Sequence, residues 1–147
     1  MKDTKVYRKF LRPLLAAALG LCVLGLTACG GPDEPEEVAV TFITSFANGD
    51  VTTAMDLIYF PERIKKDANA MNMANGKIMQ MVARGKSKID DKGGIKSITA
   101  KAVREVPQSQ DNMEKLKVDV ETITNNGSVS VDTVNLIKVN DYWKVEL

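Results

Sequence analysis

Apolar residues recur every three or four positions over the first part of the folded region, which is the spacing of an amphipathic helix. The range 38–46 follows this spacing, and Asn48–Gly49 supplies a helix stop. Asp50 is a good N-cap for a second short helix, because its carboxylate can accept from free backbone N–H groups of the first turn. Pro61 ends that helix. The pattern therefore predicts two short helices.

A third, longer helix is predicted between residues 64 and 89. Apolar positions at alternating spacings of four and three form a core-facing stripe over this range. Glycine weakens a helix, so we expect a kink or break near Asn75–Gly76 or near Gly85. Gly93–Gly94 then marks the change from a helical to an alternating period.

The remainder of the chain has the alternating pattern of β-strands. One strand is predicted over 95–106, and apolar and polar residues alternate over 116–122. Asn126–Gly127 predicts a tight hairpin, since a type I′ turn needs positive φ at both central residues. Asn140–Asp141 predicts a second tight turn into a last strand at 142–147. The four strands form an antiparallel meander.

A two-residue turn at Asn126–Gly127 decides which residues of the two hairpin strands face each other. The expected pairs are Val120 with Thr133, Val118 with Asn135, and Leu116 with Ile137. This core face carries no carboxylate. Trp143 and Val145 would then lie on the opposite face with Val134 and Leu136. Either a bulge re-aims the last strand or the sheet buries residues on both sides.

The N-terminus has the layout of a secretory signal peptide. Residues 1–12 carry five basic side chains and one acidic side chain, and 14–26 contain no charge. This apolar run is too short to span a bilayer comfortably. The following Leu-Thr-Ala-Cys-Gly at 26–30 resembles the lipobox of bacterial lipoproteins. The resemblance implies cleavage between Ala28 and Cys29 and acylation of the Cys29 thiol.

This layout predicts a signal peptide over 1–28, a short tether over 29–36 and a folded domain over 37–147. Cys22 leaves with the signal peptide, so no disulfide can form within the mature monomer. Anchoring through the lipidated Cys29 places the protein in the cell envelope. We expect it on the outer membrane, facing the periplasm, in a Gram-negative cell, and otherwise on the outer face of the plasma membrane. The membrane and the lipoprotein processing and sorting machinery are expected partners.

Composition and charge exclude several kinds of catalytic and metal-binding site. The chain has no histidine, which excludes histidine acid–base catalysis and histidine metal ligation. Asp90–Asp91 lacks the spacing of a calcium loop, and no cofactor, metal site or nucleic-acid partner is predicted. Eleven basic and four acidic residues lie between 62 and 104. This basic segment either complements the acidic first helix or faces anionic lipid or an anionic partner.

Methionine and aromatic side chains mark a candidate apolar pocket. Four methionines lie between 71 and 81, and flexible thioethers suit either an irregular core or an adaptable binding surface. Aromatic residues at the end of the second helix are candidates for the mouth of such a pocket. The candidate lining residues are Tyr59, Phe60, Met71, Met81, Val118 and Val120.

Several short motifs resemble a family of small bacterial lipoproteins. They are Gly-Gly-Ile-Lys-Ser-Ile at 93–98, the Asn-Gly hairpin and Tyr-Trp-Lys-Val at 142–145. The domains of that family have the nuclear-transport-factor-2-like (NTF2-like), or cystatin-like, α+β cone fold, and their function is unassigned. The resemblance covers roughly residues 34–147. It implies a curved sheet around helices and a cavity, but no reaction, because many unrelated functions use this cone.

Together these patterns predict an α+β, cone-like domain with two short helices and one long helix on a curved four-stranded antiparallel meander. We expect a lipid-anchored, non-enzymatic binding or interaction domain that takes an apolar ligand or an envelope protein. Two alternatives stay open: an envelope enzyme that uses a carboxylate in the cone, and a purely structural envelope component. Whether the space between helices and sheet is empty or filled discriminates between them.

Overall fold

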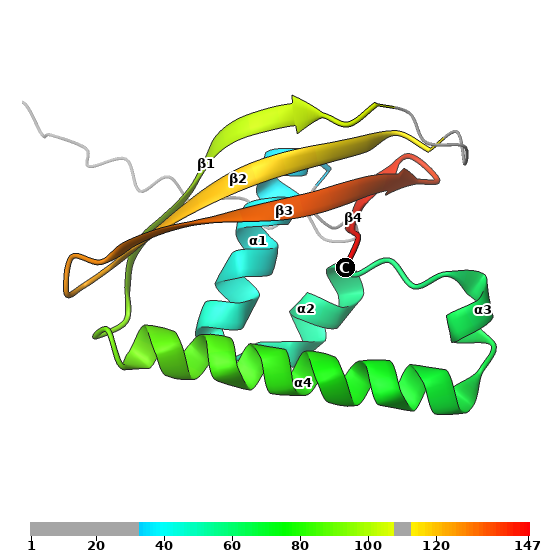
Figure 1. The fold of residues 1–147 in the computed structure, drawn as a ribbon, viewed down its shortest axis with the longest axis horizontal. Helices are drawn as coiled ribbons and strands as arrows, with labels where there is room; N and C mark the ends of the chain where they lie inside the picture. The colour runs from blue at the N-terminus through cyan, green and yellow to red at the C-terminus, as the bar shows by residue number, and fades with distance from the viewer. Residues whose placement is uncertain (1–32, 108–112) are drawn as a thin grey trace, which may run out of the picture.

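The computed structural model describes residues 33–107 and 113–147, and in these ranges helices precede one antiparallel sheet (Figure 1). The helices are α1 (Pro35–Asn48), α2 (Val51–Leu57), α3 (Glu62–Lys65) and α4 (Ala68–Asp90). The strands are β1 (Ile95–Glu105), β2 (Lys115–Thr124), β3 (Val129–Val139) and β4 (Tyr142–Val145). They lie in the order β1-β2-β3-β4, so the predicted α+β meander is confirmed.

The expected cleavage and lipidation residues, Ala28 and Cys29, lie outside the described residues, as does most of the polar loop expected at 107–112. Among the helices of the described ranges, none is long and apolar enough to cross a membrane.

α1 and α2 begin and end at capping residues. α1 starts at Pro35, inside the range expected to be tether, and ends at Asn48, followed by the cap Gly49, whose φ of 76° is in the left-handed region. Asp50 caps α2: its carboxylate accepts from the Thr53 N–H at 3.0 Å and from the Thr53 hydroxyl at 2.7 Å. The hydroxyl bond lowers the pKa of Asp50 below its usual value. The cap is therefore ionised at neutral pH, and its contribution is lost only as pH falls through that lowered pKa.

The long helix predicted from residue 64 is divided into two helices. α3 ends at Lys65, and Asp67 starts α4 by accepting from the N–H groups of Asn69 at 2.9 Å and Ala70 at 3.1 Å. The expected break near Gly76 or Gly85 is absent, because α4 runs without interruption from Ala68 to Asp90. An N-cap carboxylate, rather than a glycine, thus divides this segment.

The two glycines inside α4 have different surroundings. A Cβ on Gly76 would meet no atom within 4 Å, whereas a Cβ on Gly85 would lie 3.2 Å from both Cβ and Cδ1 of Phe46. Gly85 therefore allows α4 to approach α1 closely. The residue expected to weaken the helix is instead a contact point between two helices.

The β2–β3 hairpin turns over three residues, Asn125 to Gly127, and not over two. The Gly127 N–H donates to the Thr124 carbonyl at 2.9 Å, and the Thr124 N–H donates to the Ser128 carbonyl at 3.0 Å. Gly127 has a φ of 87°, while Asn126 is outside the left-handed region. A type I turn followed by a left-handed residue is the common three-residue hairpin. The predicted hairpin exists, but its predicted register is wrong by one residue.

This difference of one residue moves every β3 side chain to the other face of the sheet. The observed pairs are Leu116 with Leu136, Val118 with Val134, and Val120 with Asp132. Val134 and Leu136 therefore share the inner face, the face toward α1, with Trp143 and Val145. All four are buried in one core, so the last strand needs no bulge to join it. Asn140 and Asp141, at φ 50° and 67°, form the second tight turn as predicted.

The register also places polar residues on the inner face. Ser130 and Asp132 alternate with outward-facing residues and lie on the same face as Val134. Thr133 and Asn135, expected on the core face, alternate to the outer one and are exposed, whereas Ile137 alternates with them but is only 1% exposed. The expectation that the core face carries no carboxylate is therefore wrong.

Replacing Gly127 by valine should destabilise the domain by about 1–3 kcal/mol, because a β-branched residue is strained in the left-handed region. No atom lies within 4 Å of a Cβ at this position, so the loss would come from backbone strain and not from a clash. Urea unfolding followed by the fluorescence of Trp143, the one tryptophan of the chain, measures it. An unchanged midpoint would contradict the observed turn.

α1 lies between the sheet and α4 (Figure 1). It contributes Val38, Ala39 and Phe42 to the core. α4 packs against α1, α2 and α3 and makes few contacts with the strands. Because α1 lies between them, α4 does not pack directly on the sheet. A space therefore remains between α4 and the sheet, beside α1.

The segment after α2 joins the last strand. Ile58 forms a parallel bridge with Val145, and the Tyr59 N–H donates to the Val145 carbonyl at 2.8 Å. The Lys144 ammonium donates to the Asp56 carbonyl at 2.7 Å. These contacts connect the helical part of the fold to the free edge of β4.

Candidate functional site

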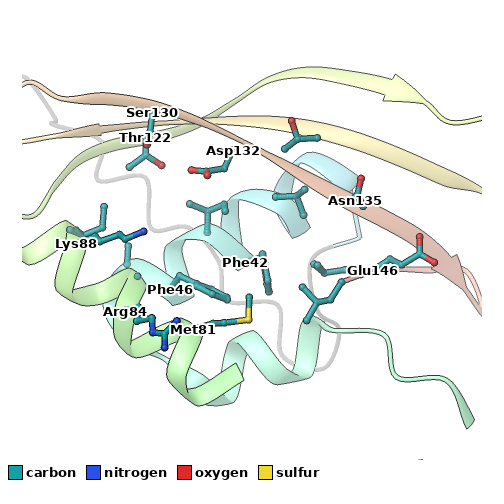
Figure 2. Close-up of a pocket in the computed structure, with 18 of the residues that line it drawn as sticks. Phe42, Phe46, Met81, Arg84, Lys88, Thr122, Ser130, Asp132, Asn135 and Glu146 are labelled. Carbon is teal, nitrogen blue, oxygen red and sulfur yellow. The ribbon is translucent and has the colours of Figure 1, made fainter. Parts of the chain in front are cut away.

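A cavity of about 680 Å³, called cavity A below, lies between α1, α4 and the inner face of the sheet (Figure 2). α1 supplies an apolar floor of Phe42, Ile43, Phe46 and Ala47. The Phe42 and Phe46 rings pack together with their centroids 4.7 Å apart. This volume and this mainly apolar lining are typical of sites for small molecules.

The α4 wall of cavity A is basic. Arg84, Lys88 and Lys92 line it, and their spacing of four residues places them along one side of the helix and its C-terminal end. Among the described residues, none of the three side chains has a hydrogen-bond or ion-pair partner. In Figure 2, the Lys88 side chain extends from α4 into the cavity.

The sheet wall of cavity A carries oxygen atoms. Thr122, Ser130 and Asp132 line it opposite the basic wall (Figure 2). Thr122 is only 2% exposed, and its Oγ1 has no hydrogen-bond partner in the structure. A buried hydroxyl without a partner is uncommon in folded proteins, since its lost hydration is not replaced.

Asp132 differs from the other carboxylates of β2 and β3. Glu121 forms an ion pair with Lys101 at 2.9 Å, and Asp119 is paired with Arg104. Within β2 and β3, which are described in full, Asp132 is the carboxylate without a partner. Cavity A therefore holds unpaired charges of opposite sign on facing walls.

At one end of cavity A, the hairpin turn is bonded to the segment that follows α4. The Asn126 N–H donates to the Lys92 carbonyl at 3.1 Å, and the Asn125 N–H donates to the Gly94 carbonyl at 3.0 Å. The Asn125 side-chain amide also donates to the Gly93 carbonyl at 2.7 Å. These hydrogen bonds attach the β2–β3 turn to the end of α4. They therefore fix the position of the sheet wall, with Asp132, relative to the α4 wall, with Lys88.

The other end of cavity A leads to a second cavity of about 680 Å³, cavity B. Met81, Glu146 and Leu147 line both cavities, so they adjoin along α4. The remaining lining of cavity B is mainly apolar, with Arg63 and Lys77 as its basic members. The Glu146 carboxylate is paired with the Lys115 ammonium at 3.0 Å.

The residues proposed from the sequence as a pocket are dispersed. Tyr59 and Phe60 line cavity B and a smaller cavity of about 360 Å³ beside β4, and Met81 lines cavities A and B. Met71 is half-buried and lines none of these three cavities. The other two proposed residues, Val118 and Val120, are fully buried in the packed core and do not line a cavity described here.

Sequence reasoning missed the charged walls of cavity A. The basic residues were noted as part of the segment 62–104, and the four-residue spacing of Arg84, Lys88 and Lys92 beside the apolar stripe was the signal that singles them out. Asp132 was missed because the expected register placed it on the outer face. No local pattern separates the two registers.

Comparison with known proteins agrees with this fold. A family model with the description "Domain of unknown function (DUF4878)" matches residues 27–146. One similar solved structure is that of a "Putative NTF2-like transpeptidase" from Campylobacter jejuni, at 25% sequence identity and a TM-score of 0.66. The match covers 78% of this chain and 98% of that chain. No curated protein matches the sequence. The fold is NTF2-like, as the sequence resemblance implied.

Proposed function

The chain belongs to the DUF4878 family, and from this premise we propose a lipid-anchored cell-envelope protein whose NTF2-like domain binds an amphipathic ligand without chemical turnover. Cavity A carries the proposal. It combines an apolar floor from α1 with charged groups that no other described residue engages. A concave site with a few converging polar groups is the usual form of a ligand-binding site.

The anchor is supported by the N-terminal sequence. A basic segment, an uncharged apolar run and Leu-Thr-Ala-Cys-Gly at 26–30 occur in the order of a lipoprotein signal. In this proposal Cys29 carries the lipid, and a tether precedes α1. The domain would then be held close to a membrane surface, where amphipathic molecules are concentrated.

Binding without catalysis is supported by the ionisable groups of the cavity. Acid–base catalysis usually needs two cooperating groups near the reacting atoms. Lys115 engages Glu146, so Asp132 has no second free carboxylate beside it in the described lining. The chain also has no histidine that could serve as a base.

An envelope enzyme that uses Asp132 is the second candidate, because this carboxylate faces the cavity. The similar structure from Campylobacter jejuni carries the word transpeptidase in its name. Acyl transfer of that kind needs a nucleophile with an adjacent base. The Thr122 hydroxyl in cavity A has no hydrogen-bond partner, so no base activates it. This observation favours binding over acyl transfer.

Photo-crosslinking with a diazirine-bearing 1-acylglycerol, a neutral amphiphile, tests the proposed binding. The full-length protein would be labelled in an amphipol, and the labelled peptides mapped by mass spectrometry. We expect label near Phe42, Phe46 and Met81. Met81→Glu should lower labelling at least about tenfold, because bound ligand would bury the new charge.

Met79→Glu is the matched control. Met79 is 55% exposed on the same helix and does not line a described cavity, whereas Met81 is 43% exposed and lines two. Labelling of the Met79 variant should equal that of the unaltered protein. Labelling that is equally weak in both variants, or absent from cavity A altogether, would contradict the proposed function.

A further inference from the structure

We infer that the ligand of cavity A is a single-chain amphiphile whose head group carries both an anion and an amine, the chemistry of a phosphoethanolamine head group. This inference rests on the proposed binding function and specifies its ligand. Arg84 and Lys88 would hold the anion, and Asp132 would accept hydrogen bonds from the amine. The apolar chain would lie on the floor formed by α1.

The anion is inferred from the α4 wall. Some basic residues of the described chain form ion pairs, such as Lys86 with Asp90 and Lys101 with Glu121. Arg84 and Lys88 form none among the described residues, and both are exposed side chains that line the cavity beside its apolar floor. An arginine with a neighbouring lysine is well suited to phosphate, since the guanidinium forms two parallel hydrogen bonds to its oxygens.

The amine is inferred from the sheet wall. Asp132 is the unpaired carboxylate of β2 and β3, and it faces the basic wall across the cavity without contacting it (Figure 2). An anion alone would be repelled by Asp132, whereas a dipolar head group is attracted by both walls. The orphaned Thr122 hydroxyl lies beneath the same wall.

The long apolar chain is inferred from the shape of the groove. Cavities A and B adjoin at Met81 and together follow α4. The opposed charges of Lys88 and Asp132 lie toward the end of cavity A where Lys92 meets the hairpin turn, and the other end of cavity A adjoins the mainly apolar cavity B. A polar end and an apolar extension match an amphiphile better than a compact polar molecule.

The test uses competition against the photoreactive 1-acylglycerol on the full-length protein. The competitors are lysophosphatidylethanolamine, lysophosphatidylcholine, whose quaternary amine has no N–H, and free glycerophosphoethanolamine. We expect lysophosphatidylethanolamine to displace the label at concentrations at least about tenfold lower than unlabelled 1-acylglycerol, and more effectively than lysophosphatidylcholine. Free glycerophosphoethanolamine should compete weakly, because it lacks the chain.

Two variants assign the head-group contacts. Lys88→Glu should weaken competition by lysophosphatidylethanolamine at least about tenfold, measured relative to competition by unlabelled 1-acylglycerol on the same variant. Asp132→Asn should remove the preference for lysophosphatidylethanolamine over lysophosphatidylcholine. Lys66→Glu is the matched control, because the Lys66 ammonium forms no salt bridge within the described residues and does not line a described cavity. Lys88→Gln replaces Lys88→Glu if the latter fails to fold.

The outcomes separate the two proposals. If 1-acylglycerol labels cavity A but lysophosphatidylethanolamine competes no better than it, the inferred head group is wrong and the binding function stands. If free glycerophosphoethanolamine competes as well as the lipid, a soluble head group is the ligand and the inferred amphiphile is wrong. If 1-acylglycerol does not label cavity A, the proposed function itself is contradicted.

Discussion

Val134→Lys is expected to prevent the domain from folding stably. Val134 is 4% exposed and packs in the core beneath the sheet, so the substitution places an ammonium group among apolar side chains. Burial of an unpaired charge costs several kcal/mol, a large part of the roughly 5–15 kcal/mol that stabilises a typical domain. In urea unfolding followed by Trp143 fluorescence, the cooperative transition should be lost or move to near-zero urea.

Val131→Lys is the matched control in the same strand. Val131 is 57% exposed on the outer face and lies opposite Glu121 in the register. A lysine there gains a nearby carboxylate, so stability should change by no more than about 0.5 kcal/mol. The register expected from a two-residue turn reverses the two results, because it places residue 131 inward and residue 134 outward. Unfolding of the Val131 variant alone would therefore contradict the observed hairpin.

Cys29→Ala should abolish stable membrane association if the proposed lipoprotein signal is correct. Without the thiol, the chain can receive no thioether-linked lipid and should remain uncut or become soluble. Since a single acyl chain already gives only marginal binding, loss of all chains should reduce the membrane-bound fraction at least about tenfold. Palmitate labelling in cells, followed by membrane fractionation, measures both lipidation and anchoring.

Cys22→Ala controls for removal of a cysteine. Cys22 lies within the apolar run before the proposed cleavage point, so its substitution should leave labelling, processing and fractionation unchanged. A processed and palmitate-labelled Cys29→Ala protein would refute the proposed anchor. That result would leave the ligand proposal for cavity A intact, because the cavity is formed by residues of the folded domain.

The elements of this fold could be predicted because their signals are local. Helical spacing before Gly49, capping by Asp50 and alternation in β2 depend on neighbours within a few residues. The division at Asp67 was missed because the apolar stripe passes through it, and its capping role shows only in the hydrogen bonds to Asn69 and Ala70. The cap at Asp67 therefore ends one helix and begins the next, although the apolar spacing continues across it.

The register, and with it the site, could not be predicted locally. Asn126–Gly127 fits both the two-residue and the three-residue turn, and each places apolar residues of β3 on one face. The choice is made by the core, because Val134 and Leu136 can pack with Trp143 and Val145 only in the observed register. Asp132 faces Lys88 as a result of that choice.

The bridge between Ile58 and Val145 determines the order in which the chain can fold. α4 and the β2–β3 hairpin join residues that are near in sequence, so each can form early. The segment after α2 meets its partner strand only at the end of the domain. Until β4 has formed, the core around Leu136 lacks the side chains of Trp143 and Val145. We therefore expect the folding rate of the domain to be limited by this non-local closure.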